Sequence, residues 1–195
     1  MKMKKKCFTK RRTDYYLIYT LAFGAIALIL YMHFFLNGKS LIWSHDGVPQ
    51  HLNSLAYYGD YLREILHRLF IEHKLEIPMW SSDVCSSDLS AFVPAEKTEY
   101  LYVFLIFLRI YLAGIAFSRY CFYHKNSKQA TLLGSLVYIF AGWTIYASMK
   151  HPYFANPMIY LPLILLGIDK IYRKEKPYVF IWSVALAGVS NFYFF

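Results

Sequence analysis

The sequence predicts an all-α membrane protein with about five transmembrane helices and an amphipathic helix in the first outer loop. Hydrophobic residues make up 57% of the 195 residues and charged residues only 17%, which is too apolar for a soluble domain of this length. Five apolar runs approach the ~20 residues that a helix needs to cross the hydrocarbon core. They cover approximately residues 15–36, 101–123, 131–149, 154–168 and 178–195. Basic residues gather at the ends of these runs, so the net charge of +9 indicates membrane topology and no nucleic-acid partner.

The first elements are a basic tail, residues 1–14, and a transmembrane helix over residues 15–37. The tail carries seven Lys or Arg residues, so the positive-inside rule predicts a cytoplasmic N-terminus. A cleavable signal peptide is the alternative, but its apolar core has about 7–15 residues and ends in small residues. This run is longer and ends in "MHFFLNGKS", which favours an uncleaved anchor.

A long polar loop over residues 38–100 follows, and the alternating topology places it outside the cell. Exposed loops on a rigid scaffold commonly carry function. Apolar residues from Leu55 to Phe70 recur at three- and four-residue steps, which predicts an amphipathic helix over residues 54–76 that lies flat in the outer interface. A helix that packs on other extracellular protein is the alternative.

The outer loop opens with "WSHDGVPQH", in which Asp46 begins a turn-like Asp-Gly-Val-Pro run. A carboxylate close to the membrane surface can accept the proton of a sugar hydroxyl that attacks a lipid-phosphate-linked donor. A turn residue bonded to its own backbone is the alternative. Gln50 can orient a sugar hydroxyl or cap the next helix. His45 and His51 can bind a cation with Asp46, but a solvated or hydrogen-bonding role is favoured because no scaffold fixes them.

The remaining apolar runs predict transmembrane helices 2–5 within residues 101–195. The loops "SRYCFYHKNSKQ" and "DKIYRKEKP" are basic and fall on the predicted cytoplasmic side. Pro157 and Pro162 lie in the fourth run, which is therefore expected to be kinked, tilted or partly re-entrant. The fifth run stops on Phe195 with no polar flank, so we expect an N-terminal fragment of a longer protein, inactive alone.

Three later residues are further candidates for substrate binding. Arg109 lies inside the second apolar run, where a charge is costly and meets a partner or a polar cavity. It either contacts the phosphate of a donor or pairs within the bundle, since Arg stems are long. His151 and Asn156 lie on the second outer turn with Tyr153, and they either line the site or anchor helix ends. No metal-ligand spacing appears, and no cofactor is expected.

Several of these segments together resemble the YfhO family of bacterial membrane proteins. They are the basic tail, the "HDGVPQH" run, "HPYFANPMIYLPLILLGIDKIYR" and "SNFYFF". The family is grouped with the C-type glycosyltransferases, which use polyprenyl-phosphate-linked sugars outside the cytoplasmic membrane. The resemblance implies a truncated bundle of that kind, with Asp46 at the position of a catalytic base and a cell-envelope polymer such as lipoteichoic acid as acceptor.

Three functions stay open on these residues. A glycosyltransferase would bind the lipid-linked donor in the bundle and use the base in the outer loop. A transporter or lipid flippase would spread polar residues through several helices at mid-depth and interrupt helices in matching positions. A structural membrane protein would tolerate change at Asp46. Arg109 is the clearly charged residue inside an apolar run, which favours the enzyme.

The segment "SSDVCSSDL", residues 81–89, repeats Ser-Ser-Asp. It lacks the glycines and the Lys of a phosphate loop, and Asp83, Cys85 and Asp88 match no familiar metal set. Its coding sequence resembles the end of a common sequencing-library adapter read in frame. We therefore predict that residues 81–89 are an assembly artefact in the outer loop, and that resequencing the locus will remove them.

Overall fold

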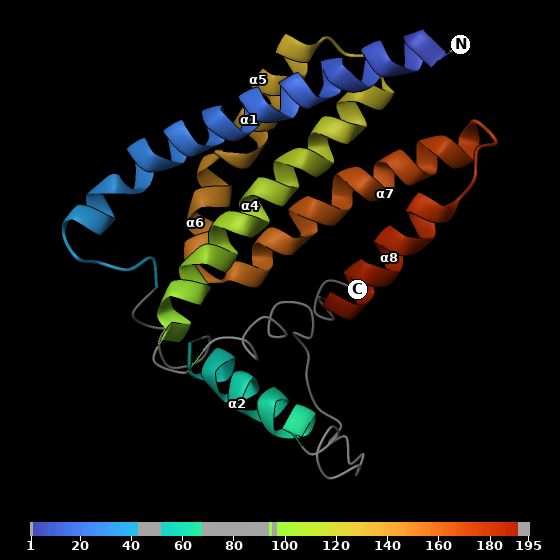
Figure 1. Cartoon of the computed structure of the whole chain (residues 1–195). Coiled ribbons are helices and arrows are strands. Elements are labelled where there is room, and N and C mark those ends of the chain that lie inside the picture. Colours follow the sequence, from blue (N-terminus) through green and yellow to red (C-terminus); the bar gives the residue numbers. More distant parts are fainter. Residues whose placement is uncertain (1, 43–51, 68–93, 95–96, 191–195) are drawn as a thin grey trace.

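The computed structural model describes residues 2–42, 52–67, 94 and 97–190, and every regular element in this part of the chain is a helix (Figure 1). The predicted all-α membrane fold is confirmed. By length and composition, three described segments can cross a membrane: Asp14–Leu36, Thr98–Tyr123 and Pro152–Tyr172. The bent pair Lys128–Ile139 and Gly142–Lys150 adds a fourth if it forms one span.

Helix α1 (Lys2–Leu36) continues from the basic N-terminal region into the first apolar run without a break. It ends where Gly38 adopts a φ of 61°, a left-handed conformation that glycine reaches without a steric cost. The amide of Lys39 then donates to the carbonyl of Phe34 at 2.9 Å. This cap turns the chain toward α2.

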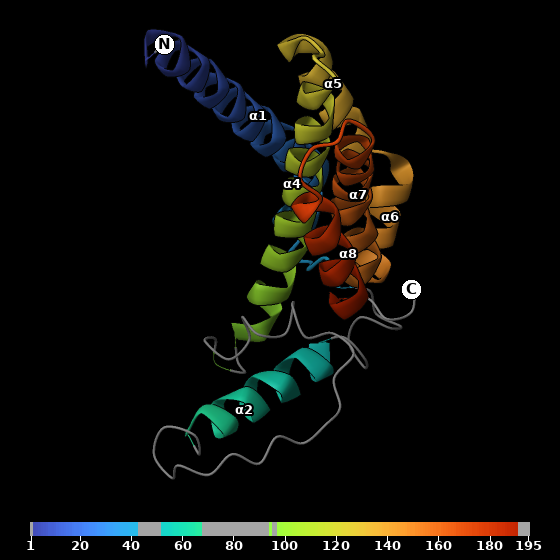
Figure 2. The same cartoon turned by 90° about the vertical axis from the view of Figure 1, so that its right-hand side faces the viewer.

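Helix α2 (Asn53–His67) lies across one end of the bundle, apart from the upright helices (Figure 2). It is amphipathic: Leu55 is buried in the main hydrophobic cluster, whereas Asp60 and Glu64 are exposed. The helix also contacts α4. The rest of the predicted interfacial helix, residues 68–76, and the segment 81–89 lie outside the described residues. We call this side of the molecule the α2 end.

Helix α4 (Thr98–Tyr123) lies at the centre of the bundle. It packs against α5 (Lys128–Ile139) and α7 (Asn156–Tyr172). Ile106, Ile110 and Ala113 lie along its buried face with at most 1% exposure. Helix α8 (Tyr178–Ser190) packs on the outside of α7. The described part of the fifth predicted run is therefore a helix of 13 residues.

The third apolar run forms two helices, α5 and α6 (Gly142–Lys150), bent by 44° at the break between them. The sequence pattern indicates a single helix here. Thr144 Oγ1 donates to the carbonyl of Tyr138 across the break at 3.3 Å. Such a side-chain bond partly replaces the helical bonding that a broken apolar helix loses.

The fourth run is longer than its proline content predicts. The short 3₁₀ helix η5 (Pro152–Ala155) leads directly into α7, where Pro157 occupies the first turn and its missing N–H has no helical partner to lose. Helix α7 continues through Pro162 to Tyr172. Together these elements make a candidate span of 21 residues.

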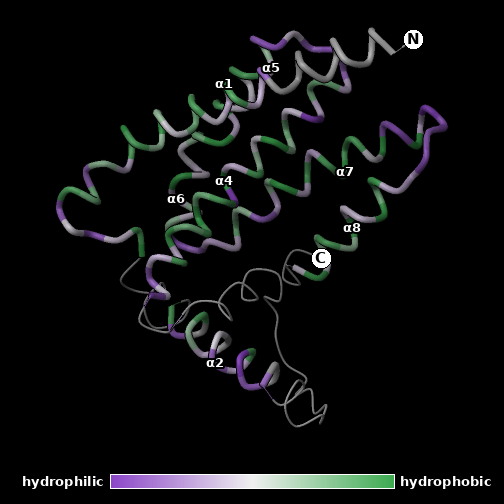
Figure 3. The backbone as a smooth tube through the Cα atoms, in the orientation of Figure 1, coloured by the Kyte–Doolittle hydropathy of each residue, from purple (hydrophilic) through white to green (hydrophobic). Residues whose placement is uncertain are grey.

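The distribution of polar and apolar groups suits a lipid environment. Large apolar side chains such as Leu21, Ile29 and Trp182 are more than 60% exposed, and Figure 3 shows hydrophobic colour along the helix shafts with hydrophilic colour in the turns. Inside the bundle, Ser118 Oγ lies 2.8 Å from both Tyr15 Oη and Ser135 Oγ. Helices in membranes commonly associate through such small and hydroxylated residues.

Candidate functional site

The candidate site predicted from sequence combines a segment of the outer loop with residues of the helix bundle. Ile42 and Leu52, the described residues on either side of the Asp46 segment, both pack against the main hydrophobic cluster. Outside the described residues lie His45, Asp46 and Gln50. Their roles stay predictions, and the described geometry bears on the other three candidates.

His151 occupies the tight connection between α6 and η5. Its extended backbone, with φ −138° and ψ 95°, follows from the proline that comes next, which disfavours helical geometry in the preceding residue. His151 Nδ1 lies 3.4 Å from Tyr153 Oη. The His151 and Phe154 ring centroids are 4.9 Å apart. The imidazole is therefore held among aromatic rings at a half-buried position.

Arg109 lies near the middle of α4 and is half-buried. Tyr102 is seven residues earlier on the same helix, so both side chains project from one face. Helix α4 also contacts η5, the short helix that carries Tyr153 and follows His151. Arg109 thus shares a helix face with Tyr102, on the helix that η5 contacts.

Tyr102 was not singled out by sequence reasoning, because it reads as one more aromatic residue in an apolar run. The side chain is only 4% exposed, and its hydroxyl has no hydrogen-bond partner among the described residues. A buried polar group normally finds a partner, and the hydroxyls of Tyr31, Thr131 and Ser190 share this lack among the described residues. The seven-residue spacing from Arg109 was the available signal.

Asn156 begins α7 and is only 7% exposed. It directly follows η5, and its burial gives it a larger role in packing than in contact with a ligand. Across the described residues, no group of three or more His, Cys, Asp or Glu side chains is placed to hold a metal ion. The described candidates thus offer a cation near the middle of α4 and an imidazole beside a phenolic hydroxyl in the turn before α7.

The comparisons with known proteins match the region that contains this group. The family described as "Bacterial membrane protein YfhO" matches residues 86–194. The chain belongs to the YfhO family. The matched residues include Arg109, His151 and Asn156, whereas the segment with Asp46 precedes the matched region.

A curated relative, "Uncharacterized protein YfhO" of Bacillus subtilis (strain 168), is 30% identical to the chain over 103 residues. That alignment covers 51% of this chain and 11% of the relative, so the chain spans only a small part of the curated protein that it matches. No solved structure matches the chain. Family membership thus establishes a membrane protein, and its activity is a matter for proposal.

Proposed function

We propose that this YfhO-family chain belongs to a membrane glycosyltransferase that moves a sugar from a polyprenyl-phosphate donor to a cell-envelope polymer such as lipoteichoic acid. The supporting observation is on α4, where Arg109 lies seven residues after Tyr102 and the buried Tyr102 hydroxyl has no hydrogen-bond partner among the described residues. A cation within a membrane-spanning helix is suited to an anionic group that enters from the bilayer. The phosphate of a lipid-linked sugar has that character.

In this reaction, Asp46 accepts the proton of an acceptor hydroxyl while that oxygen attacks the anomeric carbon of the donor sugar. The bond between the anomeric carbon and the phosphate oxygen breaks, and polyprenyl phosphate leaves. Arg109 stabilises the charge that develops on this phosphate. Ile42 and Leu52, on either side of the Asp46 segment, both pack against the main hydrophobic cluster, of which Tyr102 is a member, and this attachment to the bundle supports the assignment.

The remaining candidates act on the sugars. Gln50, His45 and His151 orient hydroxyl groups, and Asn156 shapes the turn that carries His151. We also propose the bacterial cell membrane as the location, with the N-terminus in the cytoplasm. The basic turns lie at the end of the bundle opposite α2, which supports an outer α2 end by the positive-inside rule.

The proposal is tested by Asp46→Asn in the complete protein to which this chain belongs, expressed in a strain that lacks its own copy, with sugar incorporation into envelope polymers as the readout. Loss of a general base lowers the rate by about 10²–10⁴-fold. Asp60→Asn is the matched control, because Asp60 is an exposed carboxylate on α2 that pairs with Arg63. Full glycosylation by Asp46→Asn would refute Asp46 as the base, and lipid translocation without sugar transfer would favour a flippase.

A further inference from the structure

The end of the bundle opposite α2 is strongly basic. It contains two turns, residues 124–127 between α4 and α5 and residues 173–177 between α7 and α8. These turns and the adjoining helix ends carry two acids, Asp169 and Glu175. The basic residues there are Arg119, Lys125, Lys128, Lys170, Arg173, Lys174 and Lys176.

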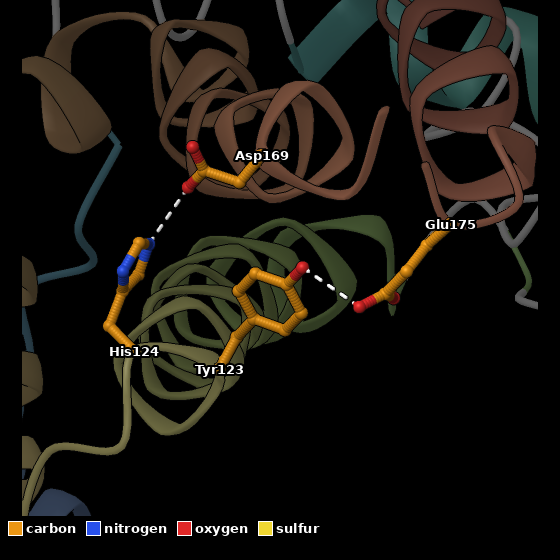
Figure 4. Close-up of polar contacts among 4 residues, drawn as sticks. All are labelled: Tyr123, His124, Asp169 and Glu175. Atoms are coloured by element: carbon orange, nitrogen blue, oxygen red, sulfur yellow. Dashed lines mark hydrogen bonds and ion pairs between the residues drawn. The ribbon is translucent and has the colours of Figure 1, made fainter. Parts of the chain in front are cut away.

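Both acids are bound by groups of the protein itself (Figure 4). Asp169 Oδ2 lies 2.8 Å from His124 Nε2. The Tyr123 hydroxyl donates to Glu175 Oε1 at 3.0 Å, and Lys170 Nζ donates to Glu175 Oε2 at 2.9 Å. These contacts join the two turns into one surface. They also leave neither carboxylate paired with the lysines at the tips of the turns.

The two tip lysines occupy equivalent and unfavourable backbone positions. Lys125 has a φ of 62° and Lys174 a φ of 58°, the left-handed conformation in which glycine is the usual residue after a helix. Both turns have the same pair of capping bonds. In the first turn, Asn126 N–H donates to the Cys121 carbonyl and Lys125 N–H donates to the Phe122 carbonyl. In the second turn, Glu175 N–H donates to the Lys170 carbonyl and Lys174 N–H donates to the Ile171 carbonyl. A charged side chain thus replaces the favoured glycine at both turns.

Exposed aromatic residues place these lysines at the level of lipid headgroups. Tyr172 and Tyr178 flank the second turn and are 84% and 60% exposed. Lys176 Nζ lies 5.9 Å from the centroid of the Tyr178 ring. Tyrosine is enriched at membrane–water interfaces, and the candidate span Pro152–Tyr172 ends at this point. The basic surface therefore meets the bilayer at its polar face.

We propose that the turns of Lys125 and Lys174 form one docking site for the phosphate headgroup of an anionic phospholipid. The charge is complementary, and basic residues near an anionic membrane surface attract such lipids. The hydrogen bonds of Tyr123 and His124 hold the two turns side by side. The proposal does not depend on sugar transfer, because it concerns the opposite end of the bundle.

The test is lipid binding to the full chain in detergent, measured by native mass spectrometry with phosphatidylglycerol and with phosphatidylcholine. The wild type is expected to prefer phosphatidylglycerol. Lys125→Gly combined with Lys174→Gly weakens that binding about 25-fold, at about fivefold for each basic residue. Lys39→Gly combined with Lys97→Gly removes the same charge from exposed positions outside the two basic turns and leaves the binding unchanged.

The glycine variants separate loss of binding from loss of structure. Glycine suits both left-handed positions, so the double variant is expected to melt at the same or a higher temperature while it binds the lipid less tightly. Equal affinity for the two lipids, or full phosphatidylglycerol binding by the double glycine variant, would overturn the proposal. Displacement of phosphatidylglycerol by millimolar inorganic phosphate would overturn it as well, because the site would then take free phosphate.

Discussion

His124 Nε2 lies 2.8 Å from Asp169 Oδ2, and this contact joins the end of α4 to the last turn of α7. The two side chains are 33% and 32% exposed, so solvent screens the pair. A double-mutant cycle with His124→Ala and Asp169→Ala is therefore expected to give a coupling free energy of about 0.5 kcal/mol. Unfolding of the purified protein in mixed micelles provides the measurement, and strictly additive single effects would contradict the contact.

Glu175 makes the stability of the turn between α7 and α8 depend on pH. The hydrogen bond from Lys170, reinforced by the one from Tyr123, lowers the pKa of the Glu175 carboxyl below its usual value. The stabilisation is present above the unfolded-state pKa and is lost as the pH falls through the folded-state pKa. The turn between α7 and α8 should loosen in acid below the ordinary range of Glu, as hydrogen exchange of its amides can show. Glu175→Gln should remove this pH dependence, and an unchanged acid profile would argue against it.

Much of the fold was predictable from sequence because apolar run length and charge at the run ends are strong local signals in membrane proteins. The runs at residues 15–36 and 101–123 coincide with candidate spans. The bend between α5 and α6 was not anticipated, since residues 131–149 are mostly apolar and have the length of a single span; Gly142, at which α6 begins, was the available local signal. Helix α7 continues through Pro162, and the kink or tilt expected for this run stays a prediction.

The site was less accessible to sequence reasoning than the fold. Arg109 was evident as a charge in an apolar run and Tyr102 lies seven residues before it, but the contact of their helix with η5 depends on how α4 meets the turn before α7. The pairing of His124 with Asp169 joins residues 45 positions apart, so no local pattern could reveal it. Asp46 stays a prediction from sequence, because the described residues begin again only at Leu52.

Tyr102 and Tyr15 offer the same substitution with opposite expected effects. The Tyr102 hydroxyl is buried without a partner among the described residues, so Tyr102→Phe removes an unpaired polar group and is expected to stabilise the protein by about 1 kcal/mol. Tyr15→Phe removes a bond of 2.8 Å to Ser118 and should destabilise by about 0.6 kcal/mol. Thermal unfolding in micelles compares the two variants, and destabilisation by Tyr102→Phe would show that its hydroxyl is bonded.

Gly167 and Gly188 test how closely α7 and α8 are packed. A Cβ atom at Gly167 would lie 2.6 Å from Phe180 Cα, and because the obstacle is backbone, a rotamer change cannot relieve the clash. Gly167→Ala must therefore separate the two helices, at a cost of about 2–3 kcal/mol. Gly188→Ala is the matched control in α8, where an added Cβ would meet no described atom within 4 Å outside the local helix backbone and alanine should stabilise the helix by about 0.5–1 kcal/mol. Similar unfolding free energies for both variants would mean that α8 does not pack on α7 through Gly167.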